Sequence, residues 1–148
     1  MTNELATLEA LRDVLIDEVN PYLPVDYTKL SSKNVLFEFP DSDTMPSDVT
    51  VFINGNYAEY EELATINDSA TFTVSVFLIV KRDTKVNLTR KMYTYFNGIY
   101  QTLRTNLSLN QTVDFTRIPS ADFYPAIEAD KNVQGVDISV EIHYTKDF

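Results

Sequence analysis

The chain has 148 residues, with 12 Lys and Arg against 22 Asp and Glu, so its formal net charge is −10. With 44% apolar residues, including nine Phe and nine Tyr, it can fill the core of a single domain. Because cysteine is absent, disulfides, thiolate nucleophiles and zinc–cysteine sites are excluded, and the single histidine excludes a histidine-rich metal site. The acidic balance disfavours general binding to nucleic acids or anionic membranes, because affinity for phosphate comes from Lys and Arg.

The charge is distributed unevenly along the chain. Residues 1–68 hold 14 acidic and three basic side chains, a net of −11, whereas residues 69–148 hold eight acidic and nine basic side chains, a net of +1. This asymmetry predicts two faces with different partners. Five of the nine bases form a cluster that we call the basic corner: Lys81, Arg82, Lys85, Arg90 and Lys91.

The N-terminal segment predicts an amphipathic helix. Asn3 is a suitable N-cap, leucines follow at three- and four-residue spacing, and Pro21 ends the helix at about Asn20. Glu4 and Glu9 stand where a signal peptide would need positive charge, and no apolar run approaches membrane-spanning length. We therefore expect neither a secretory signal nor a membrane anchor, and a cytoplasmic place of assembly.

The middle of the chain predicts short strands. Residues 35–39 alternate as a strand, residues 41–48 read as an exposed acidic loop, and residues 49–53 form a second strand. Asn54-Gly55 follows at once and predicts a hairpin turn, because both residues accept positive φ. Residues 57–64 suit either a returning strand or one helical turn.

The clearest strand covers residues 71–81, and a second helix follows it. Thr84 or Asn87 can cap this helix, whose apolar stripe continues to about Thr105. Gly98 within the helix predicts a close approach to a strand, since glycine otherwise destabilises a helix interior.

The C-terminal region predicts strands at 113–118 and 122–127 and an unambiguous strand at 136–144. In the last strand, apolar residues alternate perfectly with polar ones, so we expect one face of the strand to be exposed to solvent. The order of helix, strands, helix and strands predicts a single α+β domain with a mainly antiparallel mixed sheet flanked by two helices.

Three acidic residues near a turn are a candidate calcium site, because carboxylates suit a hard cation: Asp41, Asp43 and Asp48. An EF-hand loop that starts at Asp41 would need Gly at position 46 and Glu at position 52, but Pro46 and Phe52 stand there. This pattern favours a solvated acidic loop over a calcium site.

The remaining candidate catalytic residues are also better explained as surface residues. Paired carboxylates for general acid–base catalysis could come from Glu59, Glu61 and Glu62. No nucleophile accompanies them, so a solvent-exposed edge is favoured. His143 falls on the polar face of the last strand, which favours a surface histidine over a catalytic base. We therefore predict no catalytic, metal-binding or cofactor-binding residue and no cofactor.

Three interpretations of the basic corner remain. It can be a solvated turn between a strand and a helix, or it can meet an acidic surface on a neighbouring copy of the chain. Such a contact is head-to-tail and closes into a ring when the rotation allows. A nucleic-acid patch is disfavoured, because the run lacks interleaved aromatic residues and the field of the whole chain opposes it.

The order of elements and the C-terminal pattern carry a family resemblance. The pattern reads Phe123-Tyr124-Pro125, then Asn132-x-x-Gly135, then Ile138-x-Val140-x-Ile142-x-Tyr144. Over nearly its whole length the chain resembles the tail terminator (tail completion) proteins of tailed bacteriophages. The resemblance implies a non-enzymatic virion protein at the tail–neck junction, which forms a ring, usually six-fold, on the tail tube. It also implies a tail tube protein and a head-side connector, or stopper, as partners, with no membrane involved.

The resemblance gives the charged residues expected roles. The basic corner would contact neighbouring subunits or the tube. An acidic set would line the lumen or face a partner, and DNA would pass this wall as cargo without adhering. That acidic set consists of Asp41, Asp43, Asp48, Glu59, Glu61 and Glu62.

Alternative functions stay open from the sequence. One is another head–tail joining or neck or tail morphogenesis protein, and a second is a soluble acidic adaptor that binds a basic protein. A third is a hydrolase that uses Asp and Glu side chains, which the missing motifs disfavour.

Overall fold

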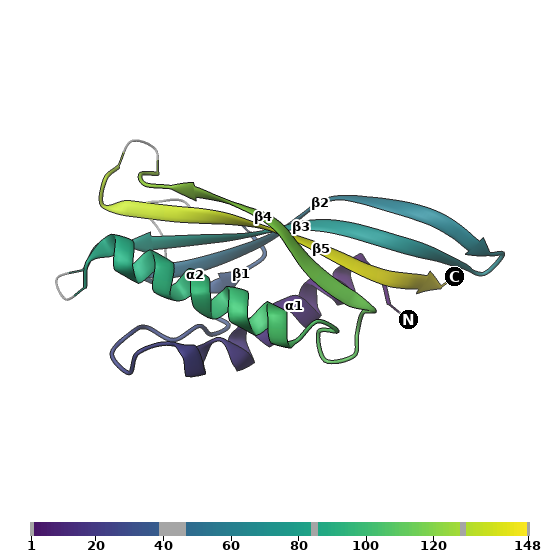
Figure 1. Cartoon of the computed structure of the whole chain (residues 1–148), viewed down its shortest axis with the longest axis horizontal. Helices are drawn as coiled ribbons and strands as arrows, with labels where there is room; N and C mark the ends of the chain where they lie inside the picture. Colours follow the sequence, from purple (N-terminus) through teal and green to yellow (C-terminus); the bar gives the residue numbers. More distant parts are fainter. Residues whose placement is uncertain (1, 39–46, 84–85, 128–129, 148) are drawn as a thin grey trace.

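The computed structural model describes residues 2–38, 47–83, 86–127 and 130–147. These residues form an α+β domain with one mixed, mainly antiparallel sheet in the order β1-β2-β3-β5-β4, and both helices lie on the same side of it (Figure 1). The predicted fold class is therefore confirmed. The elements are α1 (Glu4–Glu18), a 3-10 turn η1 (Asn20–Tyr22), β1 (Val35–Leu36), β2 (Val49–Ala64), β3 (Asn67–Lys81), α2 (Leu88–Thr105), β4 (Phe115–Tyr124) and β5 (Val133–Asp147).

The first helix forms as the sequence predicts. The Asn3 side chain accepts a hydrogen bond of 2.8 Å from the backbone N–H of Ala6, which satisfies one of the free donors at the start of α1. Leu11, Val14 and Leu15 are completely buried on the face that the helix turns to the sheet. Burial of this stripe fixes α1 on the sheet.

The predicted hairpin turn at Asn54-Gly55 is wrong. β2 runs on to Ala64, and the β2–β3 hairpin turns at residues 65–66, past both helices (Figure 1). Gly55 lies instead at a shift of strand register, where a Cβ atom would come within 2.5 Å of the Phe72 ring. Glycine is needed here for close approach, not for a turn. Residues 57–64 are thus the outer half of β2, and neither a helical turn nor a separate returning strand.

The second helix begins at the predicted cap, since the Asn87 side chain accepts from the backbone N–H of Arg90. The helix buries the predicted apolar stripe against the sheet. The prediction that Gly98 approaches a strand is wrong, because the glycine faces Val19 and Tyr22 at the end of α1 and in η1. The glycine therefore lets the two helical segments approach each other.

The two predicted strands at 113–118 and 122–127 are one strand, β4, which has an irregular register between Arg117 and Ser120. The predicted strand at 136–144 lies within the longer β5. β3 occupies the centre of the sheet and pairs antiparallel with both β2 and β5 over its whole length.

The two faces of the sheet have opposite character. The helices cover one face, where Val74, Val76 and Leu78 of β3 join the fully buried residues of β5 in the core. We call the other face the open face, because no helix in the described part of the chain packs on it. Strand alternation and pairing place these side chains there: Tyr57, Glu59 and Glu61 of β2, Thr71, Thr73 and Ser75 of β3, and Asp137, Ser139, Glu141 and His143 of β5.

Candidate assembly surfaces

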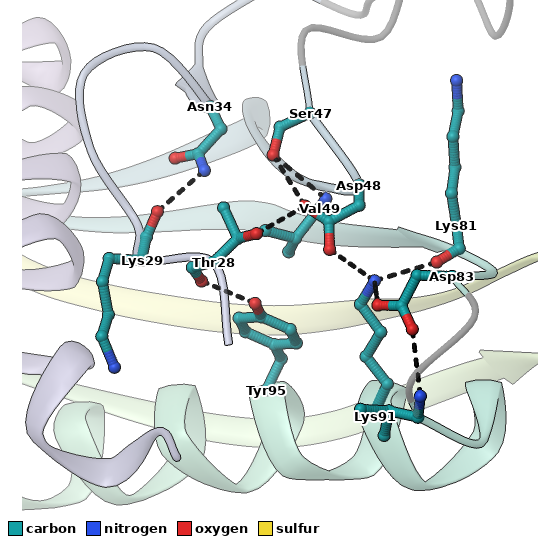
Figure 2. A network of polar contacts seen from close by, with 11 residues as sticks. Thr28, Lys29, Asn34, Ser47, Asp48, Val49, Lys81, Asp83, Lys91 and Tyr95 are labelled. Carbon is teal, nitrogen blue, oxygen red and sulfur yellow. Dashed lines mark hydrogen bonds and ion pairs between the residues drawn. The ribbon is translucent and has the colours of Figure 1, made fainter. Parts of the chain in front are cut away.

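A buried lysine organises the end of the molecule that holds the basic corner. The ammonium of Lys91 donates to Asp48 Oδ2 over 2.6 Å, to the carbonyl oxygen of Lys81 over 2.9 Å and to Asp83 Oδ2 over 3.1 Å (Figure 2). Its side chain is only 3% exposed. Three acceptors thus satisfy the three donors of one ammonium, which makes its burial tolerable.

The carboxylate of Asp48 links this lysine to the loop before β1. Asp48 Oδ1 accepts 2.6 Å from the Thr28 hydroxyl, and the Tyr95 hydroxyl of α2 donates to the Thr28 carbonyl oxygen over 2.6 Å (Figure 2). Partial burial opposes ionisation of Asp48, but the hydrogen bonds from Lys91 and Thr28 outweigh it and lower the pKa of the carboxyl group. The network therefore holds α2, the start of β2 and the loop together.

This network corrects two assignments from the sequence. Lys91 was predicted on a contact surface and Asp48 on an acidic surface, yet the two pair with each other within the chain. The buried position removes Lys91 from any surface that a neighbouring molecule can reach. A signal was present in the sequence, since Lys91 precedes the buried Tyr95 by one helical turn and therefore lies on the buried side of α2.

The other described members of the basic corner remain accessible. Arg82 is exposed, and its Nε donates to the side chain of Asn132 over 3.1 Å. Arg90 is exposed in the first turn of α2, and the side chain of the partly buried Lys81 extends away from the Lys91 network (Figure 2). Lys85 lies outside the described residues. Contact of these side chains with a neighbouring copy or a tube stays a prediction.

The predicted acidic set does not form one surface. Asp41 and Asp43 lie outside the described residues. Glu59 and Glu61 are exposed on the open face, whereas Glu62 pairs across the strands with Asp68 and therefore lies on the face that carries the helices. Only Glu59 and Glu61 of the set thus share a surface in the described part of the chain.

The open face carries carboxylates and hydroxyl groups next to an apolar part that includes Phe52, Phe77 and Ile79. Asp137 and Glu141 of β5 add to the two glutamates of β2, and Arg117 of β4 forms an ion pair with Glu141 at 3.3 Å. His143 lies on this face as predicted, where it contacts Glu141 at 2.8 Å and stacks on a phenylalanine of β4. The described side chains of this face therefore leave an excess of negative charge.

A second surface, not found from the sequence, follows the outer side of α2. Arg90, Tyr93, Asn97, Tyr100 and Arg104 recur at intervals of three and four residues and are all exposed, and we call them the α2 outer stripe. The sequence predicts only the buried stripe of this helix and groups Arg90 with the basic corner. The spacing of the two tyrosines between two arginines was the available signal.

The N-terminus of α1 is fixed to the outer part of the sheet. Glu4 accepts from the Lys146 ammonium at 2.7 and 3.0 Å and from the Tyr60 hydroxyl. Partial burial opposes ionisation of Glu4, but hydrogen bonds led by those from Lys146 and Tyr60 outweigh it and lower its pKa to about 2. This cluster joins α1, β2 and β5 and so stabilises the outer end of the sheet.

Within the described ranges, no three His, Asp or Glu side chains gather as a metal ion would need. No helix among the described residues combines the length and apolar character that a membrane crossing requires.

The chain was compared with known protein families, curated proteins and solved structures. No family model and no curated protein matches the chain. A solved structure that it resembles is the sheath/tube terminator of PVC, an extracellular contractile injection system, in the extended state. The two chains are 12% identical with a TM-score of 0.41, and the match covers 99% of this chain. The chain spans 58% of the length of that terminator chain.

Proposed function

We propose that the chain is a structural subunit of a phage-type tail. It forms a ring on the end of the tail tube, stops tube polymerisation and provides the surface to which the head-side connector attaches. The order of elements, which resembles that of phage tail terminators, supports this proposal. The single observation that carries it is the division of the sheet into a helix-covered face and an open, acidic face.

The open face suits the lumen of such a ring. If each copy turns this face inward, Glu59, Glu61 and Asp137 of every copy contribute to the wall. The carboxylates of such a wall outnumber its cation Arg117, which pairs with Glu141, so the wall repels phosphate and DNA passes without adhering. The helices then lie on the outside of the ring.

The same arrangement gives roles to the remaining surfaces. A head-to-tail contact between copies closes a ring, usually six-fold in the family that the chain resembles. Lys81, Arg82 and Arg90 face a neighbouring copy or the tube protein in this proposal. The chain acts through these surfaces, without catalysis and without a cofactor.

A polymerisation assay tests this function. The tube protein of the same particle is polymerised with and without the chain, and tube lengths and tube ends are measured by electron microscopy. We expect shorter tubes that carry a ring at one end. Tubes of unchanged length with bare ends would contradict the proposal. An acidic adaptor would instead bind a basic protein in a salt-sensitive manner and leave tube length unchanged.

A further inference from the structure

The α2 outer stripe has a composition that points to a partner. Its side chains project from one side of the helix, with an arginine at each end and two tyrosines between them, and the sequence of α2 contains no acidic residue. Tyr93 is 43% exposed and Tyr100 is 38% exposed, and Tyr93 stacks on Phe123 of β4 at 5.2 Å between ring centroids. The stripe is thus an aromatic surface between two cations, held in place by the sheet below it.

The charges of this stripe are not neutralised by the residues that the structure describes. Neither Arg90 nor Arg104 forms an ion pair with any described residue. Their Cα atoms lie about 21 Å apart along the helix axis, from the rise of 1.5 Å per residue. A matching partner therefore offers acidic groups along an element of comparable length.

The same chain carries such an element. Glu9, Asp13 and Asp17 recur every four residues on the exposed side of α1, and Leu5 on that side is 60% exposed. We call these four residues the α1 acidic stripe. No ion pair with a described residue engages its carboxylates. The nearby Arg12 donates instead to the carbonyl oxygen of Val35 over 2.8 Å.

We propose that the α1 acidic stripe of one copy docks on the α2 outer stripe of the next copy. This inference rests on the proposed ring and names its subunit contact. Glu9 and Asp17 lie about 12 Å apart along α1, so Arg90 and Arg104 reach them by leaning inward about 4–5 Å each. Leu5 and the two tyrosines supply the apolar part of the contact.

The contact must form between copies. Within one chain, α1 and α2 meet through other sides, at Val19 and Gly98, so the two stripes stay free of each other. Each copy therefore offers one stripe of each kind, and the contact is head-to-tail. Exposed ion pairs are individually weak, so the tyrosines anchor the contact and the charges select the partner.

Cysteine cross-linking tests the contact cleanly, because the natural chain has no cysteine. Asp13→Cys places a thiol midway between Glu9 and Asp17, and Asn97→Cys places one midway between Arg90 and Arg104. These two midpoints meet whether the helices dock parallel or antiparallel. A short bis-maleimide is added to a mixture of the two variants, one of them carrying a mass tag. Val25→Cys, at a site 98% exposed and outside both stripes, replaces Asp13→Cys in the control mixture.

The inference predicts a cross-linked mixed dimer in the test mixture, at least tenfold more abundant than in the control mixture. A chain with both thiols should give a ladder of multimers. If native mass spectrometry shows a ring but the test mixture does not exceed the control, the docking inference is overturned and the proposed function stands. If Asn97→Cys cross-links to the tube protein instead, α1 is the wrong occupant. If the unmodified chain forms no ring, with or without tubes, both proposals fail.

Charge reversal provides a second test that a folding defect cannot imitate. Arg90→Glu with Arg104→Glu, or Glu9→Lys with Asp13→Lys and Asp17→Lys, should each weaken assembly at least tenfold. All five changes in one chain should restore assembly, because opposite charges face each other again. If the chain with all five substitutions keeps its circular dichroism spectrum and melting temperature but does not assemble, the inference is overturned.

Discussion

Lys91 and Asp48 form an ion pair of 2.6 Å that joins α2 to the residue before β2, and the lysine side chain is almost fully buried. A buried charge with its partners removed is strongly destabilising, even where an intact pair contributes little net stability. The pair therefore specifies how the helix, the sheet and the loop at Thr28 fit together.

Replacement of the lysine tests this arrangement. We expect Lys91→Met to lower the free energy of unfolding by about 2 kcal/mol, less than for a fully buried pair because Asp48 is 32% exposed and regains water. Urea unfolding measures the change. Arg82→Met, which truncates an exposed cation of the same corner, serves as the control and should change stability by about 0.5 kcal/mol or less. Equal effects of the two substitutions would contradict the structural role of Lys91.

The cluster around Glu4 predicts a stability change in acid. Its pKa is lowered from 4.5 to about 2 in the folded chain, so the contribution of Glu4 is fully present above pH 4.5. That contribution is lost as the pH falls from about 4.5 to about 2. We expect Glu4→Gln to cost about 1–2 kcal/mol at pH 6, allowing for solvent screening, and nearly nothing at pH 2.

Chemical unfolding at several pH values measures this difference. Lys146→Met removes the partner of Glu4. In a chain that carries Lys146→Met, the further change Glu4→Gln should therefore cost less free energy of unfolding over the same pH window than it does in the parent. A constant difference between parent and Glu4→Gln from pH 6 to pH 2 would show that the carboxylate is not held by this cluster.

The close approach of Gly55 to Phe72 predicts a coupled pair of substitutions. Gly55→Ala places a methyl group against the Phe72 ring, so we expect a loss of about 1–2 kcal/mol from overpacking. Phe72→Leu makes room and should offset part of that loss. A double-mutant cycle by urea unfolding checks the coupling, and strictly additive effects would mean that the ring does not constrain Gly55.

The negative charge of the open face is expected to prevent DNA from adhering to the ring. Glu59→Lys with Glu61→Lys replaces two negative charges of this face by two positive ones, and we expect the assembled ring to retain double-stranded DNA in a salt-dependent manner. Glu62→Lys with Asp68→Lys makes the same change in charge on the opposite face and is the control. Gel mobility shifts at two salt concentrations compare the two variants. Equal retention by both would contradict an inward-facing open face.

The sequence was sufficient where short-range chemistry decides the structure. The Asn3 and Asn87 caps, the buried stripe of α2 and the alternation in β5 all follow from residues within one element. These features fixed the positions of the helices and the α+β class. The polar side of β5 also placed His143 correctly.

Prediction from the sequence was wrong where the position of a residue depends on a contact with a residue far away in the chain. Gly55 follows a turn-forming asparagine, yet its position is set by Phe72 on the next strand. Lys91 belongs to a run of bases, yet its ammonium is held by Asp48, which lies 43 residues earlier. Charge patterning along the chain does not show these pairings. For this reason the predicted basic corner includes the buried Lys91, and the predicted acidic set includes its partner Asp48.

We propose that the chain forms a ring on the tube with its open face inward. Cryo-electron microscopy of the chain bound to tail tubes tests it most directly. We predict a closed ring coaxial with one tube end, with the β2 and β5 carboxylates of the open face toward the lumen and the helices outside. Bare tube ends, or a ring whose helices line the lumen, would contradict the claim.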